Sequence, residues 1–199
     1  YVPKGVYIIN DGTINLPTGC ELRGAGRKAS VLKTALDKTT ISIIGGEGQV
    51  IRDLKIDNRG FTGTRTTYDI SICNPFHPLI ENVEVSLSQT SRQKGGINIY
   101  RDELLPYLNW FMPVLNNILI RNGVLRIADV TDVKVQGGWV WGTYTEAPGA
   151  VELAGASNCS FKDLDIVPSV NAGYLVSGHL SNLSIVGGLM DGNGDPSIH

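Results

Sequence analysis

Short stretches of alternating apolar and polar residues follow one another along the chain, and one phrase recurs six times: apolar, any, Asn or Asp, apolar, any, apolar. The copies lie at 51–56, 80–85, 115–120, 130–135, 161–166 and 180–185. A second alternating stretch precedes each copy, at 41–43, 70–72, 97–99, 125–127, 151–153 and 174–176. Alternation with a period of two sends successive side chains to opposite faces of a β-strand. The pattern therefore predicts a repeating unit of strand, corner and strand.

The spacing of the units predicts a solenoid. The starts of the first strands are 29, 27, 28, 26 and 23 residues apart. A β-unit of this length cannot bury its apolar face alone, but stacked copies can. We predict an all-β, right-handed, single-stranded parallel β-helix of about six to eight coils, stacked at roughly 4.8 Å. A β-sandwich also has evenly spaced strands, but it gives no reason to repeat one phrase in register.

The recurring Asn or Asp is expected at a bend in each coil. Its short side chain can bond to backbone groups that the bend leaves unpaired, and stacked Asn side chains can bond to one another. An ionised Asp does this less well because it only accepts hydrogen bonds. We therefore expect scaffold roles, not catalysis, for Asp53, Asn82, Asn117, Asp132, Asp163 and Asn182.

Composition narrows the class of protein. The 199 residues are 42% hydrophobic and 18% charged, which is typical of one globular domain with a substantial core. The formal net charge of −2 argues against a nucleic-acid surface, and no apolar run is long enough to span a membrane. We expect one domain over 1–199, with opening coils at 1–40, regular coils at 41–190 and a tail at 191–199. Because neither end carries a cap, the chain is expected to be a segment of a longer polypeptide.

The N-terminal stretch suggests a family. It contains a Pro-Lys-Gly-Val-Tyr strand at 3–7, Leu-Pro-Thr-Gly at 16–19 and Leu-Arg-Gly-Ala-Gly at 22–26. These motifs resemble the opening coils of the pectate-lyase-like β-helix superfamily, especially its bacteriophage tailspike branch.

That resemblance implies a receptor-binding protein on the phage tail, exposed to the host cell surface. Such a protein is a homotrimer that binds bacterial capsule or O-antigen polysaccharide and hydrolyses it as an endoglycosidase, with no nucleic-acid partner and no membrane insertion. The alternatives are a non-catalytic carbohydrate-binding or structural spike segment, and a secreted bacterial polysaccharide lyase or epimerase.

Four stretches interrupt the repeat and are the expected place for function: 58–68, 86–95, 100–113 and 137–149. Three of them follow the Asn-bearing strand and should emerge on one side, separated by a short connection at 121–123. The resulting groove would have Arg121 and Asn122 as its floor. Its aromatic candidates for stacking on sugar rings are Trp139, Trp141, Tyr144, Tyr107 and Trp110. These aromatics would also serve to seat the loops on the helix body, or to form a subunit interface.

Hydrolysis of a glycan needs two carboxyl groups, about 5 Å apart in a retaining enzyme and about 6.5–9.5 Å apart in an inverting one. One of them must stay protonated through burial or a like charge. Glu146 and Glu152 flank the return from the tryptophan-containing stretch and are the first candidates, followed by Asp102 and Glu103. Each would otherwise be a solvated surface group.

A lyase would need a basic side chain and a cation instead, and no spacing singles out a base. The arginines that could bind acidic sugars are Arg59, Arg65, Arg92 and Arg121. No metal or cofactor is expected. Residues 191–195 alternate oxygen ligands as a calcium loop does, but Pro196 stands where that loop needs Gly.

Overall fold

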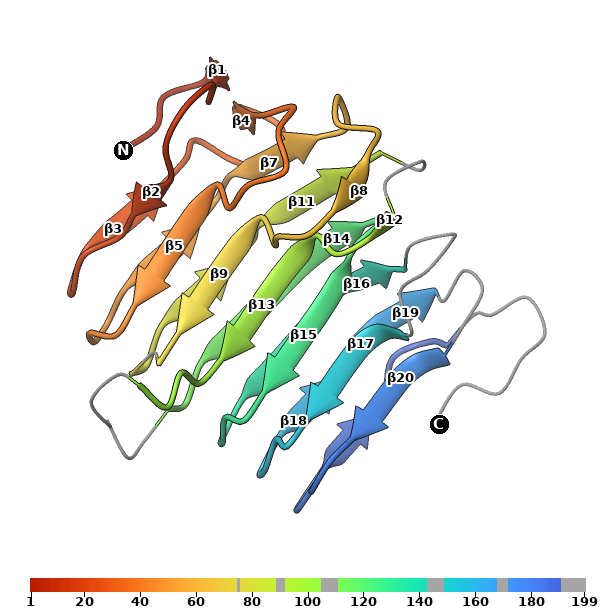
Figure 1. Ribbon diagram of the computed structural model, residues 1–199. Coiled ribbons are helices and arrows are strands. Elements are labelled where there is room, and N and C mark those ends of the chain that lie inside the picture. Colours follow the sequence, from red (N-terminus) through yellow and green to blue (C-terminus); the bar gives the residue numbers. More distant parts are fainter. Residues whose placement is uncertain (75, 89–91, 105–110, 143–148, 168–171, 191–199) are drawn as a thin grey trace.

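The structure is a computed structural model that describes residues 1–74, 76–88, 92–104, 111–142, 149–167 and 172–190. Within these ranges all regular elements are β-strands, stacked in parallel as a solenoid of about six turns (Figure 1). The predicted parallel β-helix is thereby confirmed, and the arrangement is consistent with a pectate-lyase-like fold. Over the same ranges the chain has no helix long and apolar enough to cross a membrane.

One face of the solenoid is a seven-stranded sheet made from the first strand of each unit. Its register places Ile41, Ile70, Ile97, Leu125 and Val151 side by side across five coils. The six alternating stretches predicted from the sequence all belong to this sheet. In order its strands are β2 (Ile14–Asn15), β5 (Ile41–Ile44), β9 (Ile70–Cys73), β13 (Gly96–Tyr100), β15 (Val124–Ala128), β17 (Gly149–Ala154) and β20 (Ala172–Ser177).

Most of the remaining strands form one twelve-stranded sheet. In each coil this sheet turns a corner, which we call the bend, and the corners of successive coils stack along the solenoid axis. The strands before the bend are β3 (Glu21–Arg23), β6 (Val50–Arg52), β10 (Leu79–Glu81), β18 (Ser160–Lys162) and β21 (Ser184–Val186). Those after it, which we call the second limb, are β1 (Gly5–Ile8), β4 (Ser30–Lys33), β7 (Lys55–Asn58), β11 (Glu84–Leu87) and β19 (Asp165–Val167). The long strands β14 (Val114–Arg121) and β16 (Lys134–Trp141) run through the bend, so their C-terminal halves also belong to the second limb. A further small sheet joins β8 (Thr64–Arg65) to β12 (Arg92–Gln93).

The core fills the inside of the solenoid with aligned aliphatic side chains. Ile43, Ile72, Ile99 and Ile127 stack from coil to coil and are completely buried. Each coil buries its inward residues against the coils above and below, so stability comes from stacking between neighbours. The outward side chains are left free to carry chemistry.

The bend of the twelve-stranded sheet is built by left-handed residues. Asp53, Asn82, Asn117 and Asp163 have φ between 49° and 58°. Asn and Asp tolerate this conformation better than other residues with a side chain. The Asn82 Nδ2 donates to Asp53 Oδ1 at 2.7 Å, and Asn117 Nδ2 donates to Asn82 Oδ1 at 3.3 Å. The predicted Asn ladder therefore exists at this bend.

The expectation of a single register for all six phrases is wrong. Lys134 pairs with Val114 and Ser160, so Asp132 lies at the corner before β16 and not at the bend within the sheet. Asn182 lies at the same earlier corner, where its Nδ2 donates to Asn158 Oδ1 at 2.8 Å. In these two coils the bend is made by glycine, at Gly137 and Gly187. The same sequence pattern occurs at both corners because each corner needs a left-handed residue between two extended segments.

Because of this difference in register, Trp139 and Trp141 lie on a strand and not in the predicted loop. The sequence predicts that 137–149 is a loop, but β16 continues through the Gly137-Gly138 bend to Trp141. Trp139 and Trp141 therefore point outward from a strand of the second limb, with Val140 buried between them. Their neighbours are thus fixed by the sheet: Trp139 pairs with Leu119 and Trp141 with Arg121.

Candidate functional site

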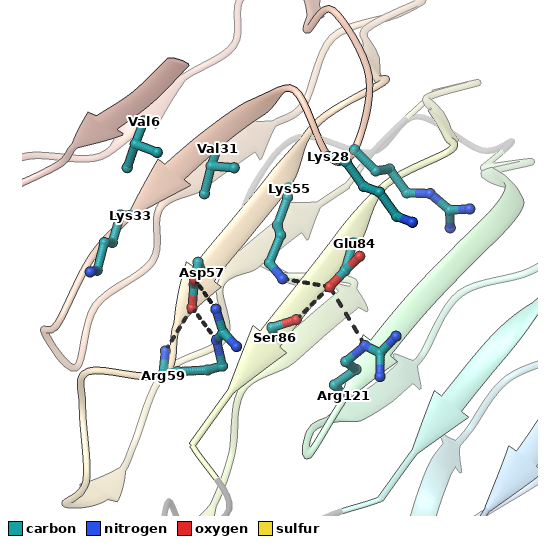
Figure 2. Close-up of a pocket in the computed structure, with 11 residues that line it drawn as sticks. Val6, Lys28, Val31, Lys33, Lys55, Asp57, Arg59, Glu84, Ser86 and Arg121 are labelled. Atoms are coloured by element: carbon teal, nitrogen blue, oxygen red, sulfur yellow. Dashed lines mark hydrogen bonds and ion pairs between the residues drawn. The ribbon is translucent and has the colours of Figure 1, made fainter. Parts of the chain in front are cut away.

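The outer surface of the second limb holds a groove rich in basic side chains (Figure 2). It has a volume of about 500 Å³ and crosses β4, β7, β11 and the end of β14. We call it the basic groove. It is lined by Val6, Arg27, Lys28, Val31, Lys33, Lys55, Asp57, Arg59, Glu84, Ser86 and Arg121.

Charge in the basic groove opposes that of the whole chain. Six lining residues are cationic and two are carboxylates, a local balance of 6 − 2 = +4, whereas the chain carries −2. Lys28 and Lys33 are exposed, and neither forms an ion pair with a described carboxylate. A surface cleft lined by one sign of charge concentrates ligands of the opposite sign. The groove therefore attracts anions.

Glu84 is at the centre of the groove and is held ionised. Its Oε1 accepts hydrogen bonds from Lys55 Nζ at 2.6 Å and Ser86 Oγ at 2.8 Å, and Arg121 Nε lies 3.6 Å away. Burial alone would raise the pKa of Glu84, but these hydrogen bonds and charges outweigh it and lower the pKa below its usual value. A carboxyl group in this state is not a proton donor.

The second carboxylate of the groove is also committed. Arg59 donates a bidentate pair of hydrogen bonds to Asp57, from Nε to Oδ1 at 2.8 Å and from a terminal nitrogen to Oδ2 at 2.7 Å. The Arg59 hydrogen bonds lower the pKa of Asp57 despite its burial. Neither carboxylate therefore meets the requirement of acid catalysis for a protonated carboxyl group.

An aromatic hollow of about 260 Å³ adjoins the basic groove, and Arg27 and Arg121 line both. Its other lining residues are Asn117, Ile118, Leu119, Gly138 and Trp139. Trp139 is 49% exposed and meets Trp141 edge to face, with ring centroids 6.3 Å apart. The Arg121 guanidinium lies 5.6 Å from the centre of a Trp141 ring, which fixes both side chains through a cation–π contact.

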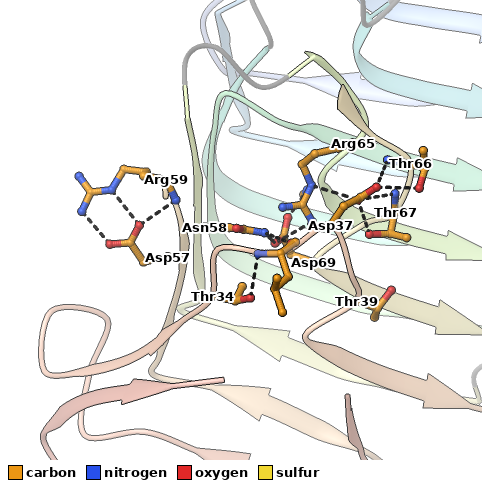
Figure 3. A network of polar contacts seen from close by, with 12 residues as sticks. Thr34, Asp37, Thr39, Asp57, Asn58, Arg59, Arg65, Thr66, Thr67 and Asp69 are labelled. Carbon is orange, nitrogen blue, oxygen red and sulfur yellow. Dashed lines mark hydrogen bonds and ion pairs between the residues drawn. The ribbon is translucent and has the colours of Figure 1, made fainter. Parts of the chain in front are cut away.

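Two of the interrupting stretches are joined where they leave the second limb. The pairing of β8 with β12 connects 58–68 to 86–95, as expected if both emerge at one edge. Figure 3 shows the polar network that anchors the first of them. Asp37 accepts hydrogen bonds from the backbone and hydroxyl groups of Thr66 and Thr67.

Arg65 does not contribute to binding, contrary to its expected role for acidic sugars. Its side chain is completely buried, and a terminal nitrogen lies 3.2 Å from Oδ1 of the equally buried Asp69. Asp69 also accepts hydrogen bonds from Asn58 Nδ2 at 3.1 Å and Gly96 N at 2.9 Å. The pair ties the connection between two coils to the core.

Glu152 lies on a different surface, the outer face of the seven-stranded sheet. It pairs in register with Arg126, whose Nε is 3.9 Å from Glu152 Oε2, while Arg126 also donates to Asn98 Oδ1 at 3.1 Å. Burial raises the pKa of Glu152 against the charges of Arg126 and Lys94. Burial, aided by the charge of Glu152, raises the pKa of Tyr68 to about 12. Glu152 is thus a half-buried carboxyl group in a different sheet from Trp139 and Trp141.

The other predicted residues are spread over the fold. Asp102 exchanges backbone hydrogen bonds with the Asn74 side chain and caps Leu104 N at 3.0 Å, while Glu103 is exposed beside it. Asn122 donates to Leu87 O at 3.1 Å and lines neither hollow. Glu146, Tyr144, Tyr107, Trp110 and residues 191–195 lie outside the described residues.

Of the side chains in or beside the two hollows, the sequence pattern singles out Arg59, Arg121, Trp139 and Trp141, but not the three lysines Lys28, Lys33 and Lys55. Lys33 and Lys55 occupy outward positions of alternating strands, and Lys28 precedes β4. The alternation at 30–33 and 55–58 was the available signal. Only the pairing of β4 with β7 brings these cations to one surface.

Comparisons of the chain with protein-family models, with curated proteins and with solved structures gave no match. Among the residues that the structure places, no three His, Cys, Asp or Glu side chains are grouped so as to hold a metal ion. The function is accordingly inferred from the side chains of the basic groove and the aromatic hollow.

Proposed function

We propose that this protein binds an acidic polysaccharide along the second limb, as the receptor-binding segment of a tailspike-like protein. The observation that carries the proposal is the position of the exposed cations Lys28 and Lys33, which pair with no described carboxylate, in a groove that continues to the exposed ring of Trp139. Carboxylate, sulfate or phosphate groups would pair with the cations, and a sugar ring would stack on the tryptophan. The attachment setting and a homotrimer enter the proposal from the sequence resemblance.

Binding is favoured over cleavage in this groove by the state of its carboxylates. Asp57 and Glu84 are both ionised and occupied by basic partners. Asp165 is in register beside Trp139, three strands from Glu84, which corresponds to roughly 14 Å. That separation exceeds both carboxyl spacings used by glycoside hydrolases, about 5 Å and about 6.5–9.5 Å.

The proposal is tested by measuring binding to an acidic bacterial polysaccharide panel, with neutral dextran as the reference, over a series of salt concentrations. The double variant Lys28→Gln/Lys33→Gln should lose roughly tenfold in affinity at low salt, since each exposed ion pair contributes up to about 1 kcal/mol. Lys134→Gln/Lys162→Gln is the matched control, because it removes the same charge from exposed positions outside both hollows. Equal losses in both double variants would reduce the binding to general attraction and refute the groove.

Cleavage of the glycan is a second candidate, at a surface separate from the basic groove, and Glu152 on the outer face of the seven-stranded sheet is the observation that favours it. Burial raises the pKa of Glu152, which favours the protonated form that a general acid needs to donate to a glycosidic oxygen. Its predicted partner Glu146 lies outside the described residues. Glu152→Gln should then abolish the release of short fragments while leaving binding unchanged. Unsaturated fragment ends, detected by ultraviolet absorbance, would indicate a lyase and contradict this role.

A further inference from the structure

The outward residues of the second limb form two rows that run along the axis of the solenoid. The register of six strand pairings places one residue from each coil in each row. The first row is Val6, Val31, Lys55, Glu84, Leu119, Trp139 and Asp165, and the second is Ile8, Lys33, Asp57, Ser86, Arg121, Trp141 and Val167. A ligand lying on this surface therefore meets a fixed order of chemical groups.

The order is unequal from end to end. Lys33, which has no carboxylate partner among the described residues, lies at the β4 end, where Figure 2 shows it extending away from the paired groups. Lys28, likewise without a described carboxylate partner, lies on the other side of Lys55, toward Glu84. In the middle the side-chain charges are paired, because Lys55 and Arg121 share Glu84 and Arg59 is bound to Asp57. Trp139 lies at the β16 end, and the next residue in its row is the carboxylate Asp165.

The two ends suit different sugars. Unpaired ammonium groups favour a ligand unit that carries a carboxylate, sulfate or phosphate. The exposed Trp139 ring beside Leu119 favours the apolar face of a neutral ring. The two arginines of this hollow are already engaged, Arg121 by Glu84 and Trp141 and Arg27 by the Asn117 carbonyl. Asp165 would repel an acidic substituent at that end, whereas it can accept hydrogen bonds from sugar hydroxyls.

The two ends of the groove are farther apart than one sugar unit, so a ligand that reaches both must carry both kinds of unit in one chain. Four strand steps separate β4 from β16, which is roughly 19 Å at the spacing of paired strands. Arg27 spans the interval, since it lines both hollows and donates to Asn117 O at 3.4 Å. We infer that the groove recognises an acidic heteropolysaccharide lying along the solenoid axis, with acidic substituents at Lys33 and at Lys28 and a neutral unit on Trp139.

This inference rests on the proposed function, and binding of two defined oligosaccharides separates them. The probes are hyaluronan oligosaccharides, in which acidic and neutral units alternate, and oligogalacturonates of equal length, in which every unit is acidic. Hyaluronan should bind more tightly, and Trp139→Ala should weaken it roughly 3- to 10-fold without changing its salt dependence. Trp139→Phe should retain most of the affinity, whereas Lys28→Gln/Lys33→Gln should weaken both probes and reduce their salt dependence.

The outcomes distinguish recognition of a heteropolysaccharide from binding of any acidic polysaccharide. Equal affinity for the two probes, together with no effect of Trp139→Ala, would overturn the heteropolysaccharide while leaving acidic polysaccharide binding intact. No binding of either probe would refute both for this groove. Unchanged thermal unfolding of the Trp139 variants is the check that a loss of affinity comes from the lost ring.

Discussion

The side-chain amide of Asn82 donates to the carboxylate of Asp53 across 2.7 Å, which joins the left-handed bends of two successive coils. Asn117 continues the ladder by donating to Asn82 Oδ1 at 3.3 Å. Asn82 therefore has two separable roles, one in backbone conformation and one in hydrogen bonding.

Substitutions at Asn82 should separate these roles. Asn82→Ala loses both hydrogen bonds and also forces a Cβ-bearing residue without local polar compensation into φ 53°, so the expected cost is about 2–3 kcal/mol of unfolding free energy. Asn82→Gly keeps the conformation and should cost about 1 kcal/mol less. Urea unfolding of the three proteins measures this. Equal losses for Ala and Gly would mean that the left-handed conformation is not a significant constraint at this position.

The glycine bend before Trp139 gives a second pair of variants. A Cβ at Gly138, where φ is 110°, would overlap the carbonyl oxygen of Ile118 in the neighbouring strand. Gly137, where φ is 65°, has open space around the same position. Gly138→Ala should therefore destabilise by about 3 kcal/mol or more and Gly137→Ala by about 1 kcal/mol. Thermal unfolding gives the comparison, and a larger loss for Gly137→Ala would contradict the pairing of β14 with β16.

Acid should weaken the fold through Glu84. Its folded pKa lies below the usual 4.5, so in the unfolded chain this group takes up a proton first as the pH falls. The stabilisation from Lys55 and Ser86 is complete above about pH 4.5 and is lost as the pH falls from there through the folded pKa. Urea unfolding at a series of pH values should show a steeper acid loss for the wild type than for Glu84→Gln. Parallel curves would contradict the depressed pKa.

The buried pair of Arg65 and Asp69 should be sensitive to losing one partner. Asp69→Ala takes the nearest carboxylate from a completely buried guanidinium and leaves it only Asp37, whose Oδ1 is 4.0 Å from Arg65 Nε, so the expected cost is about 3 kcal/mol. The double variant Arg65→Met/Asp69→Ala removes both charges and should recover part of that loss. Chemical unfolding provides the measurement. A double variant less stable than Asp69→Ala would show that Arg65 stabilises the fold independently of the ion pair.

The sequence predicts the stacking of coils because the alternation at 41–43, 70–72 and 97–99 is strict and local. It misplaces Asp132 and Asn182 because two different corners impose the same local need, a left-handed residue before a short strand. Only pairing between coils tells these corners apart, as the alignment of Lys134 with Val114 does. The same limit hid the basic groove, since Lys28, Lys33 and Lys55 are brought together by strands from different coils.

The two-row arrangement also bears on how such a surface can diversify. Because each coil supplies one residue to each row, a substitution in one coil changes one step of the recognised chain and leaves the others in place. Duplicating or deleting a whole coil would lengthen or shorten the surface by roughly 4.8 Å without disturbing the stacking on either side. If the proposed function holds, ligand length and ligand composition are thus independently adjustable in this architecture.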